Sequence, residues 1–364
     1  MADATYTLQI RNPAGTLVAE LANVLDLDAG RSINTPAALR VRLAPEAIAA
    51  TILVPDARMR LLRTGTDGLA RVALNSDFLL RSWRQGYAGN AQFVELAGQG
   101  AAQILARRIV AYAAGSAQAE KAAAAASNIM RALVRENLGS SAAADRDLST
   151  WLQVEADDGV GASIAKSVAW RPLDGALADV AEASALAGTL LYWHIAWATG
   201  AGKYEFQVKA GQPGADRTAS VQLDSAAGDV QDALLLRDYT AQISHVYVGG
   251  QGVGAARTVV EVDAPERLGS SPFGRVEGWA DRRQYTSSTG MSDEGRAELW
   301  DKRARVLFSG TVNAGAWEYS RYWEFGDRVR VLHAGQRLTC MINSVRIGLA
   351  GGAETITADL REVG

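Results

Sequence analysis

Residues 245–263 read HVYVGGQGVGAARTVVEVD, an apolar run that leads into a cluster of glycines. From Gly250 to Ala255 they match G-x-G-x-x-A, a pattern of dinucleotide-binding proteins in which a strand leads into a helix. A pyrophosphate site requires that helix, because its free N–H groups and its dipole point at the phosphates. Here a β-branched run from Arg257 to Asp263 follows, alternating apolar and polar residues as strands do. We therefore predict a β-hairpin that binds no nucleotide.

The composition describes a globular protein. The chain has 364 residues, of which 48% are hydrophobic and 21% charged, and this length suggests roughly two or three domains. The net charge is −3, from 37 basic and 40 acidic residues. Because neither sign is concentrated in one segment, nucleic acid or an anionic membrane is not expected as the main partner. The sequence predicts no signal peptide and no membrane-spanning segment, so we expect a soluble protein made in the cytoplasm.

The sequence pattern changes twice, which predicts three domains with soft limits near residues 110 and 225. Residues 1–110 form short alternating strands joined by turns, typical of a β-sandwich or barrel. Residues 111–225 place helical patterns between strand-like runs and predict an α+β domain. Residues 226–364 are mostly strand again, with one helix. The expected fold class is therefore α+β and dominated by strands.

Three helices are expected from apolar spacing and from end signals. The first spans residues 117–138 and ends at Gly139, the second spans about 173–187, and the third spans about 292–306 with Ser292 as its cap. The residues expected on their buried faces are Ile129, Met130, Leu133 and Val134, then Leu173, Leu177, Val180 and Ala181, then Ala297, Trp300, Ala304 and Leu307.

Strand patterns continue to the end of the chain. Residues 188–197 and 203–208 are expected to pair with each other. Gly326 and Asp327 are expected to form a tight turn, because the segments on either side read as strands. The expected strands near the C-terminus are residues 322–325, 327–332, 338–342 and 354–360.

Few residues have the arrangement of a catalytic, cofactor or metal site. His194, His245 and His333 lie far apart and lack the local spacing of zinc ligands. Cys340 is the only cysteine, so no intrachain disulfide can form, and we expect a buried, inert thiol. Residues 269–273 form a turn without the strand-turn-helix context of a serine nucleophile. We therefore predict no catalytic, cofactor-binding or metal-binding residues, and a protein that is not an enzyme.

The middle segment is rich in aromatic residues, which allows a sugar-binding face, although packing around the helices is the interpretation we favour. These residues are Trp151, Trp170, Tyr192, Trp193 and Trp197. Hydrolysis of a glycan would need two facing carboxylates. The nearby acidic cluster consists of Glu155, Asp157 and Asp158. Residues 26–30 and 155–159 resemble fragments of calcium loops but lack the remaining oxygen ligands.

Three groups of segments, in this order, carry a family resemblance. The first comprises residues 78–83 (FLLRSW), 105–110 (LARRIV), 117–138 and 144–147 (ADRD). The second comprises the hairpin residues 248–257, then 275–283 (RVEGWADRR) and 293–299 (DEGRAEL). The third comprises residues 322–331 (YWEFGDRVRV) and the closing strands. Together these resemble a family of siphovirus tail proteins related to the baseplate hub of contractile phages, over nearly the whole chain.

The resemblance implies tube-like β-barrel domains with an inserted α/β domain, in a ring at the distal end of the tail, commonly a trimer. Such a hub joins the tail tube and the distal tail protein to the tip or fibres. It leaves a channel for the tape-measure protein and then for DNA, so DNA is a partner only in transit. An added hydrolase or fibre-binding region, which some hubs carry, is not expected because the chain ends after its final strands.

Assembly is also expected on physical grounds, because exposed sheet edges invite aggregation unless neighbouring subunits cover them. We expect a closed ring of three copies, in which two similar barrels per chain approximate six-fold symmetry. The duplication is implied by the resemblance, since no internal repeat is detectable between residues 1–110 and 226–364. Two alternatives stay open: a distal tail protein, which normally forms a six-fold ring, and a tail-associated protein that binds glycans or hydrolyses peptidoglycan.

Overall fold

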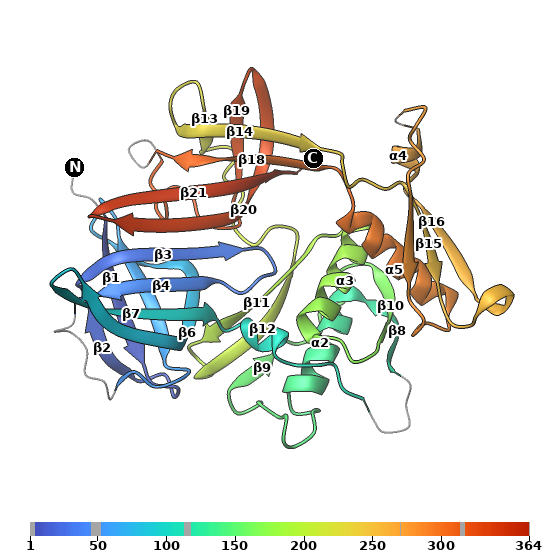
Figure 1. Cartoon of the computed structure of the whole chain (residues 1–364), viewed down its shortest axis with the longest axis horizontal. Helices are drawn as coiled ribbons and strands as arrows, with labels where there is room; N and C mark the ends of the chain where they lie inside the picture. Colours follow the sequence, from blue (N-terminus) through green and yellow to red (C-terminus); the bar gives the residue numbers. More distant parts are fainter. Residues whose placement is uncertain (1–3, 45–51, 113–117, 270, 314–316, 364) are drawn as a thin grey trace.

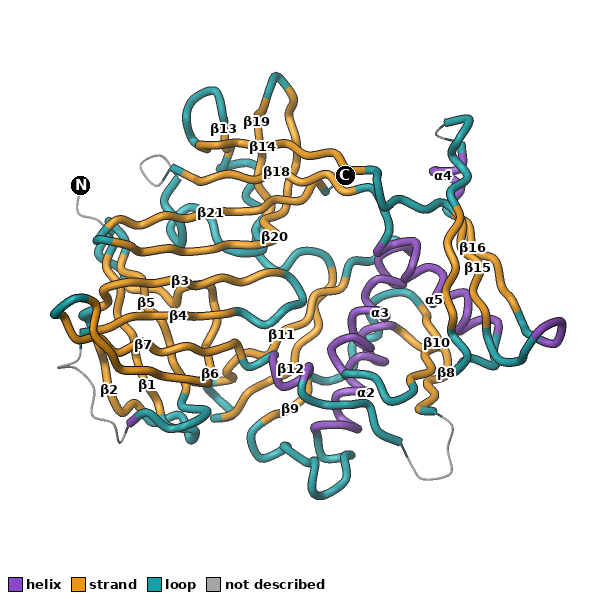
Figure 2. The backbone as a smooth tube through the Cα atoms, in the orientation of Figure 1, coloured by secondary structure: helices purple, strands orange, loops and turns teal. Residues whose placement is uncertain are grey.

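The structure is a computed structural model that describes residues 4–44, 52–112, 118–269, 271–313 and 317–363. Strands dominate it, and most belong to one large sheet drawn from both ends of the chain (Figures 1 and 2). The strands from the N-terminal part are β1 (Thr5–Arg11), β2 (Leu17–Leu21), β3 (Val24–Ser32), β4 (Ala38–Leu43), β5 (Arg58–Thr64), β6 (Ala70–Ala88) and β7 (Ala91–Gly100). Those from the C-terminal part are β13 (Gln222–Asp224), β14 (Val230–Asp238), β18 (Arg305–Val312), β19 (Arg328–His333), β20 (Gln336–Ala350) and β21 (Ala353–Glu362).

Alternating side chains build the core of this sheet. Leu39, Val41 and Leu43 of β4 are buried, while Arg40 is exposed and Arg42 half-buried, as expected of a strand with one face on a core. They belong to one apolar cluster with residues of β20 such as Ile347. The two ends of the sequence therefore fold around a shared core.

The middle of the chain forms a helical layer with two small sheets (Figure 1). Its elements are α1 (Gln103–Ala106), β8 (Ala119–Ala125), α2 (Ala126–Leu138), β9 (Leu152–Val154), β10 (Ser163–Val168), α3 (Leu173–Leu186), β11 (Leu191–Ala198) and β12 (Lys203–Ala210). The structure confirms the second helix and the antiparallel pairing of residues 191–198 with 203–210. The eight residues expected on the buried faces of the first two helices are all buried in a separate core. No helix among the described residues is long and apolar enough to cross a membrane.

The helix predicted over residues 117–138 is longer than the one in the structure. The alanine-rich run over 119–125 is the strand β8, which pairs with β10, and only residues 126–138 are helical. Residue 117 lies outside the described residues. Alanine favours helices in isolation, but the partner strand β10 gives the backbone of this run its hydrogen bonds. Tertiary pairing therefore overrides the local propensity.

A third unit contains the glycine-rich hairpin. Its elements are β15 (His245–Gly249), β16 (Val259–Asp263), α4 (Pro265–Leu268), β17 (Glu277–Asp281) and α5 (Ser288–Asp301). The structure confirms the hairpin, because β15 and β16 pair antiparallel and are joined by the loop 250–258, which contains a short 3-10 turn. Gly252 has a φ of +101°, and a Cβ there would lie 2.5 Å from the carbonyl oxygen of Ala256. The glycine serves the tight turn.

The third predicted helix is displaced. It spans Ser288–Asp301, and its cap is Ser287, whose hydroxyl accepts a hydrogen bond from the N–H of Gly290. Ser292 lies inside the helix, and residue 304 and Leu307 follow it, with Leu307 in β18. Several serines and acidic residues precede the apolar positions, so the local signals did not distinguish between the two starts.

The turn at Gly326 and Asp327 is confirmed, but the strand expected before it is wrong. Residues 322–325 form a turn that contains one isolated bridge, between Tyr319 and Trp323. Trp323 and Phe325 are buried by packing rather than by strand pairing, and the ring of Trp323 lies 5.0 Å from that of Tyr319. The three closing strands are confirmed as β19, β20 and β21.

The large sheet contains the same arrangement of five strands twice. In the first unit (β3–β7), strands that follow each other in sequence lie in the spatial order β3-β4-β7-β6-β5. In the second unit (β14 and β18–β21), the order is β14-β18-β21-β20-β19. Every neighbouring pair in both units is antiparallel. The chain therefore carries a structural duplication, with β15–α5 inserted after the first strand of the second copy.

Candidate assembly surface

The two units meet in a junction within the chain. The first strand of the first unit, β3, pairs antiparallel with the fourth strand of the second unit, β20. The pairing runs from Ser32 opposite Ser344 to Leu27 opposite Leu349. It joins the units into one continuous sheet, which Figure 1 shows as the stack of β20 on β3. Among the described residues the duplicated chain thus has one such junction formed, while the equivalent strands β14 and β6 do not pair with each other.

The equivalent of β20 in the first unit is β6, the longest strand. Its residues 70–79 pair with β5 on one side, whereas its residues 78–88 pair with β7 on the other. Among the described residues, the segment 82–88 therefore has one free hydrogen-bonding edge. Trp83 and Tyr87 on this segment are 42% and 67% exposed, so the free edge also carries apolar surface.

The equivalent of β3 in the second unit is β14, and both strands are nine residues long. Within the described part of the chain, β14 pairs with β18 alone and forms one end of the large sheet. Leu234 and Leu236 on it are 58% and 43% exposed. A long strand with unpaired backbone groups and exposed apolar side chains is a template for another strand. β14 and the end of β6 are therefore the equivalents of β3 and β20, but they do not pair with each other within the described chain.

One face of the joined sheet carries arginines that pair with a smaller number of carboxylates, some of them shared. Arg346 on β20 forms two hydrogen bonds of 2.8 Å with Asp28 on β3, and Arg84 lies 2.8 Å from Glu95. The hydrogen bonds from Arg346 lower the pKa of Asp28, and those from Arg84 do the same for Glu95. Arg42 lies 3.0 Å from Asp26 in the same groove. This face offers a phosphate little unmatched positive charge.

The histidines occupy three separate settings. His245 is buried and contacts Asp263 at 2.5 Å, and His333 lies 2.9 Å from the hydroxyl of Ser225. His194 stacks on Tyr192, and burial lowers its pKa to about 4. The described residues contain no group of three or more His, Cys, Asp or Glu side chains that could hold a metal ion.

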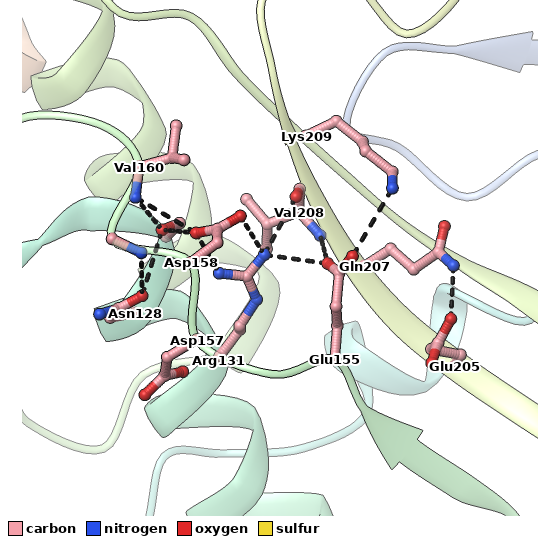
Figure 3. Close-up of polar contacts among 12 residues, drawn as sticks. Asn128, Arg131, Glu155, Asp157, Asp158, Val160, Glu205, Gln207, Val208 and Lys209 are labelled. Atoms are coloured by element: carbon pink, nitrogen blue, oxygen red, sulfur yellow. Dashed lines mark hydrogen bonds and ion pairs between the residues drawn. The ribbon is translucent and has the colours of Figure 1, made fainter.

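The carboxylates of the predicted acidic cluster form ion pairs with arginines (Figure 3). Arg131 on α2 is fully buried and lies 2.9 Å from Glu155 and 2.5 Å from Asp158. Asp157 pairs with Arg135. Burial alone would raise the pKa of Glu155, but hydrogen bonds from Arg131 and from the N–H of Val208 hold it below the usual value. Glu155 and Asp158 are thus held as carboxylates by Arg131, which joins the loop around residue 158 to α2.

The aromatic residues of the middle segment do not form one face. Trp193 and Tyr192 are buried, as expected of core residues, and Trp197 packs against Arg58. The packing interpretation is wrong for Trp151 and Trp170, which are 45% and 63% exposed. Cys340 is buried as predicted, and burial raises the pKa of its thiol to about 12. Ser270, in the turn pattern 269–273, lies outside the described residues.

The free edges of β14 and of residues 82–88 were not predicted from the sequence. Residues 82–88 (SWRQGYA) and 230–238 (VQDALLLRD) do not differ in composition from the paired strands. Whether a strand edge is free depends on which strands lie beside it, and these come from distant parts of the chain. An alternating pattern reports only the face of a strand that is buried, not its edge. The aromatic residues Trp83 and Tyr87 give no sequence signal of a free edge, because their exposure is known only from the structure.

Comparison with known proteins gives a match along most of the sequence. Residues 7–358 match the family model described as Siphovirus ReqiPepy6 Gp37-like protein. No curated protein sequence matches the chain. Among solved structures, the 43 kDa tail protein of prophage MuSo2 from Shewanella oneidensis has a similar fold, with a TM-score of 0.59 and 12% identity over 99% of this chain and 98% of that one. A tail protein from Neisseria meningitidis MC58 gives the same TM-score and identity over 100% and 98%.

A third similar structure comes from another kind of assembly. The E. coli c3393 protein is described as a component of the type VI secretion system with structural similarity to the T4 bacteriophage tail proteins gp27 and gp5. It has a TM-score of 0.50 and 12% identity over 98% of this chain and 77% of that one. At such identities the likeness shows the fold, and the family follows from the match to residues 7–358. The protein belongs to the Siphovirus ReqiPepy6 Gp37-like family, a family of structural proteins of the phage tail and baseplate.

Proposed function

We propose that the protein is the hub of a siphovirus tail tip, a closed ring of three copies around a channel. The observation that carries this proposal is the pair of free edges left by a duplicated unit. In each copy β3 fills the edge of β20, while the equivalent strand β14 and the equivalent edge of β6 have no partner among the described residues. Pairing β14 of one copy with β6 of the next repeats the internal junction and makes the sheet continuous.

The duplication also argues for the number of copies. A head-to-tail contact generates a closed ring when its rotation divides a full turn. If the internal and external junctions have the same geometry, each unit turns the sheet by the same angle, and three chains supply six units. Such a ring matches a six-fold tail tube, which is the arrangement implied by the family resemblance. A distal tail protein of six copies would need only one unit per chain, so the duplication favours the hub.

The charge pattern of the sheet suits a channel wall. We assign the face that carries Asp28, Glu95, Arg42 and Arg346 to the lumen, because its arginines are already paired with carboxylates. Unpaired arginines would bind phosphates and release counterions, which holds DNA in place. A balanced face lets the tape-measure protein and then DNA pass.

The partners of such a ring follow from its position. On one side the hub contacts the tail tube and the distal tail protein, and on the other it contacts the tip or fibre proteins. The virion tail tip is then its location. The three-stranded sheet of β15, β16 and β17 packs against α5, beyond the helices and away from the large sheet in Figure 1, and gives the hub additional surface for these contacts.

Cross-linking tests the proposed contact. A chain with Trp83→Cys and Leu234→Cys places one thiol on each free edge, while the native Cys340 is buried and does not compete. Tails assembled from this chain and treated with a short bismaleimide should give a covalent trimer on a denaturing gel, with no larger species. The control pair Leu69→Cys and Leu234→Cys uses an equally exposed leucine in the turn before β6 and should give monomers. A trimer from the control pair, or none from the test pair, would contradict the contact.

A further inference from the structure

A cavity of about 930 Å³ lies between the C-terminal strands of the large sheet and the ends of α3 and α5. Its volume is within the range of ligand sites, about 300–1,000 Å³. Four arginines from different parts of the chain line it: Arg303, Arg305, Arg328 and Arg361. Among the described lining residues, Glu362 is the only carboxylate. The cavity therefore gathers more positive charge than its own walls neutralise.

Two of these arginines have no carboxylate partner among the described residues. The guanidinium groups of Arg303 and Arg361 lie over the indole of Trp300, at 4.1 and 5.1 Å from the ring centre. A cation–π contact holds a cation in place without neutralising its charge. Nη1 of Arg303 also donates a hydrogen bond of 2.6 Å to the backbone oxygen of Trp300, whereas Arg361 makes no hydrogen bond or ion pair in the described part of the chain. Burial and the charges of Arg361 and Arg305 lower the pKa of Arg303 to about 10.

The N–H groups of the four arginines are open to a ligand. Arg303 and Arg361 are half-buried, but neither has a buried nitrogen without a partner, so their unused N–H groups reach solvent in the cavity. The side chains of Arg305 and Arg328 are 54% and 38% exposed, and each lies 3.9 Å from one exposed carboxylate. That distance is too long for a hydrogen bond, so donors remain for a ligand.

A second cavity, of about 370 Å³, adjoins the first and brings two more carboxylates near the arginines. It shares Arg303, Arg305 and Arg361 with the first cavity and adds Glu182 and Asp301. Burial is the main reason why the pKa of Glu182 rises to about 7, so its carboxyl carries only part of a charge at neutral pH. Asp301 is 57% exposed. The arginines around the two cavities therefore keep an excess of positive charge.

We infer that the first cavity binds an acidic segment of a partner protein. Guanidinium groups bind carboxylates through charge-assisted hydrogen bonds, and clusters of arginines recognise acidic motifs in this way. The walls also include Leu190, Val306 and Leu307, which suit a segment that mixes apolar and acidic side chains. No described residue of β14 or of the segment 82–88 lines the cavity, so the site is separate from the proposed contact between subunits.

A nucleic acid suits the cavity less well than a peptide. Proteins bind single strands through exposed aromatic side chains on which the bases stack. Trp300 is the only aromatic residue among the described lining residues, and it already contacts two arginines. Single-stranded DNA is therefore the competing ligand in the test.

Fluorescence anisotropy with the purified full chain tests this site. The probes are a fluorescein-labelled peptide EFDELD, its neutral counterpart QFNQLN, and a labelled single-stranded oligonucleotide of about 12 nucleotides. The acidic peptide should bind, and the other two probes should bind at least about ten-fold more weakly. Arg303→Gln and Arg361→Gln should each weaken binding of the acidic peptide by about ten-fold, because each removes charge-assisted hydrogen bonds. The matched control is Arg283→Gln, which removes an arginine that is 66% exposed and lies outside the cavity, and it should leave binding unchanged.

The melting temperature separates lost binding from lost structure. Arg361 has no hydrogen bond or ion pair to lose among the described residues, and its charge opposes that of Arg303, so Arg361→Gln should not lower the melting temperature. Arg361→Lys keeps the charge without the planar fork and should recover part of the affinity. The inference is wrong if the acidic peptide does not bind the wild-type chain, or binds Arg361→Gln equally well. It is also wrong if the DNA binds more tightly than the acidic peptide, or if Arg361→Gln melts below the Arg283→Gln control.

Discussion

Gly326 stands at the turn that opens the last three strands, and the chain around it leaves no space for a side chain. Its φ is +85°, a conformation that residues other than glycine rarely adopt. A Cβ would lie 2.7 Å from Cβ of Pro213 and 3.0 Å from the backbone nitrogen of Gly214. The neighbouring Asp327 accepts a hydrogen bond of 2.7 Å from the N–H of Ala215. The turn is therefore held against a distant loop.

Replacing Gly326 with valine should destabilise the fold by about 1–3 kcal/mol, because the side chain meets both the unfavourable φ and the contact with Pro213. Urea denaturation followed by tryptophan fluorescence measures this as a lower midpoint. The control is Gly30→Ala, where the nearest atom to the added Cβ is 3.8 Å away and φ is not positive. An unchanged midpoint for Gly326→Val would show that the turn does not need glycine.

Glu182 on α3 gives a prediction for the pH dependence of stability. Burial, with the nearby charges of Asp179 and Asp301, raises the pKa of its carboxyl from 4.5 to about 7. The folded state therefore favours the protonated form, and this contribution is present below pH 4.5 and is lost as the pH rises through 7. Glu182→Gln should be more stable than the wild type above pH 7, by about 1–3 kcal/mol, and no more stable below pH 4.5. Urea denaturation of both proteins above pH 7 and below pH 4.5 checks this prediction. An equal difference in the free energy of unfolding between variant and wild type at the two pH values would contradict it.

At the scale of elements, a buried ionic cluster joins the middle segment to the C-terminal helix. Lys166 on β10 is 3% exposed, lies 2.7 Å from Asp179 on α3 and also pairs with Glu294 on α5. Glu294 further accepts hydrogen bonds from Tyr285 at 2.6 Å and from Arg282 at 2.8 Å. Burial alone would lower the pKa of Lys166, but the two carboxylates raise it above its usual value. One ammonium group thus fixes the positions of α3 and α5.

Lys166→Met should destabilise the protein by about 3–5 kcal/mol, because it removes the shared cation of a buried cluster and leaves Asp179 with only Arg171 and Glu294 with only Arg282. Lys302→Met is the control: Lys302 is 39% exposed and its partner Glu298 keeps Arg282, so the loss should stay below about 1 kcal/mol. Urea denaturation compares the two variants. If Lys166→Met costs no more than Lys302→Met, the cluster does not hold the helices together.

Local sequence patterns predicted some of the secondary-structure elements correctly and others wrongly. The hairpin at 245–263 and the closing strands were predicted correctly, because alternation and glycine turns are local signals. The strand β8 was not, since its alanines favour a helix until β10 lies beside them. The duplication was invisible because the two units share strand order rather than residues.

At the scale of the whole molecule, the chain is two copies of one strand arrangement joined at β3 and β20. The helical middle segment lies between the two units in sequence, and β15–α5 is an insertion within the second. Both insertions leave the order of the strands in the sheet unchanged. The proposed ring therefore needs no rearrangement of the chain, only the pairing of β14 with β6 of a neighbour.

Electron cryomicroscopy of the tail tip tests this ring most directly. We expect three copies around the channel, six five-strand units in all, with β14 of each copy hydrogen-bonded to residues 82–88 of the next. The face that carries Asp28 and Arg346 should line the lumen. A ring of six copies, or a map in which β14 and the end of β6 both face solvent, would contradict the account.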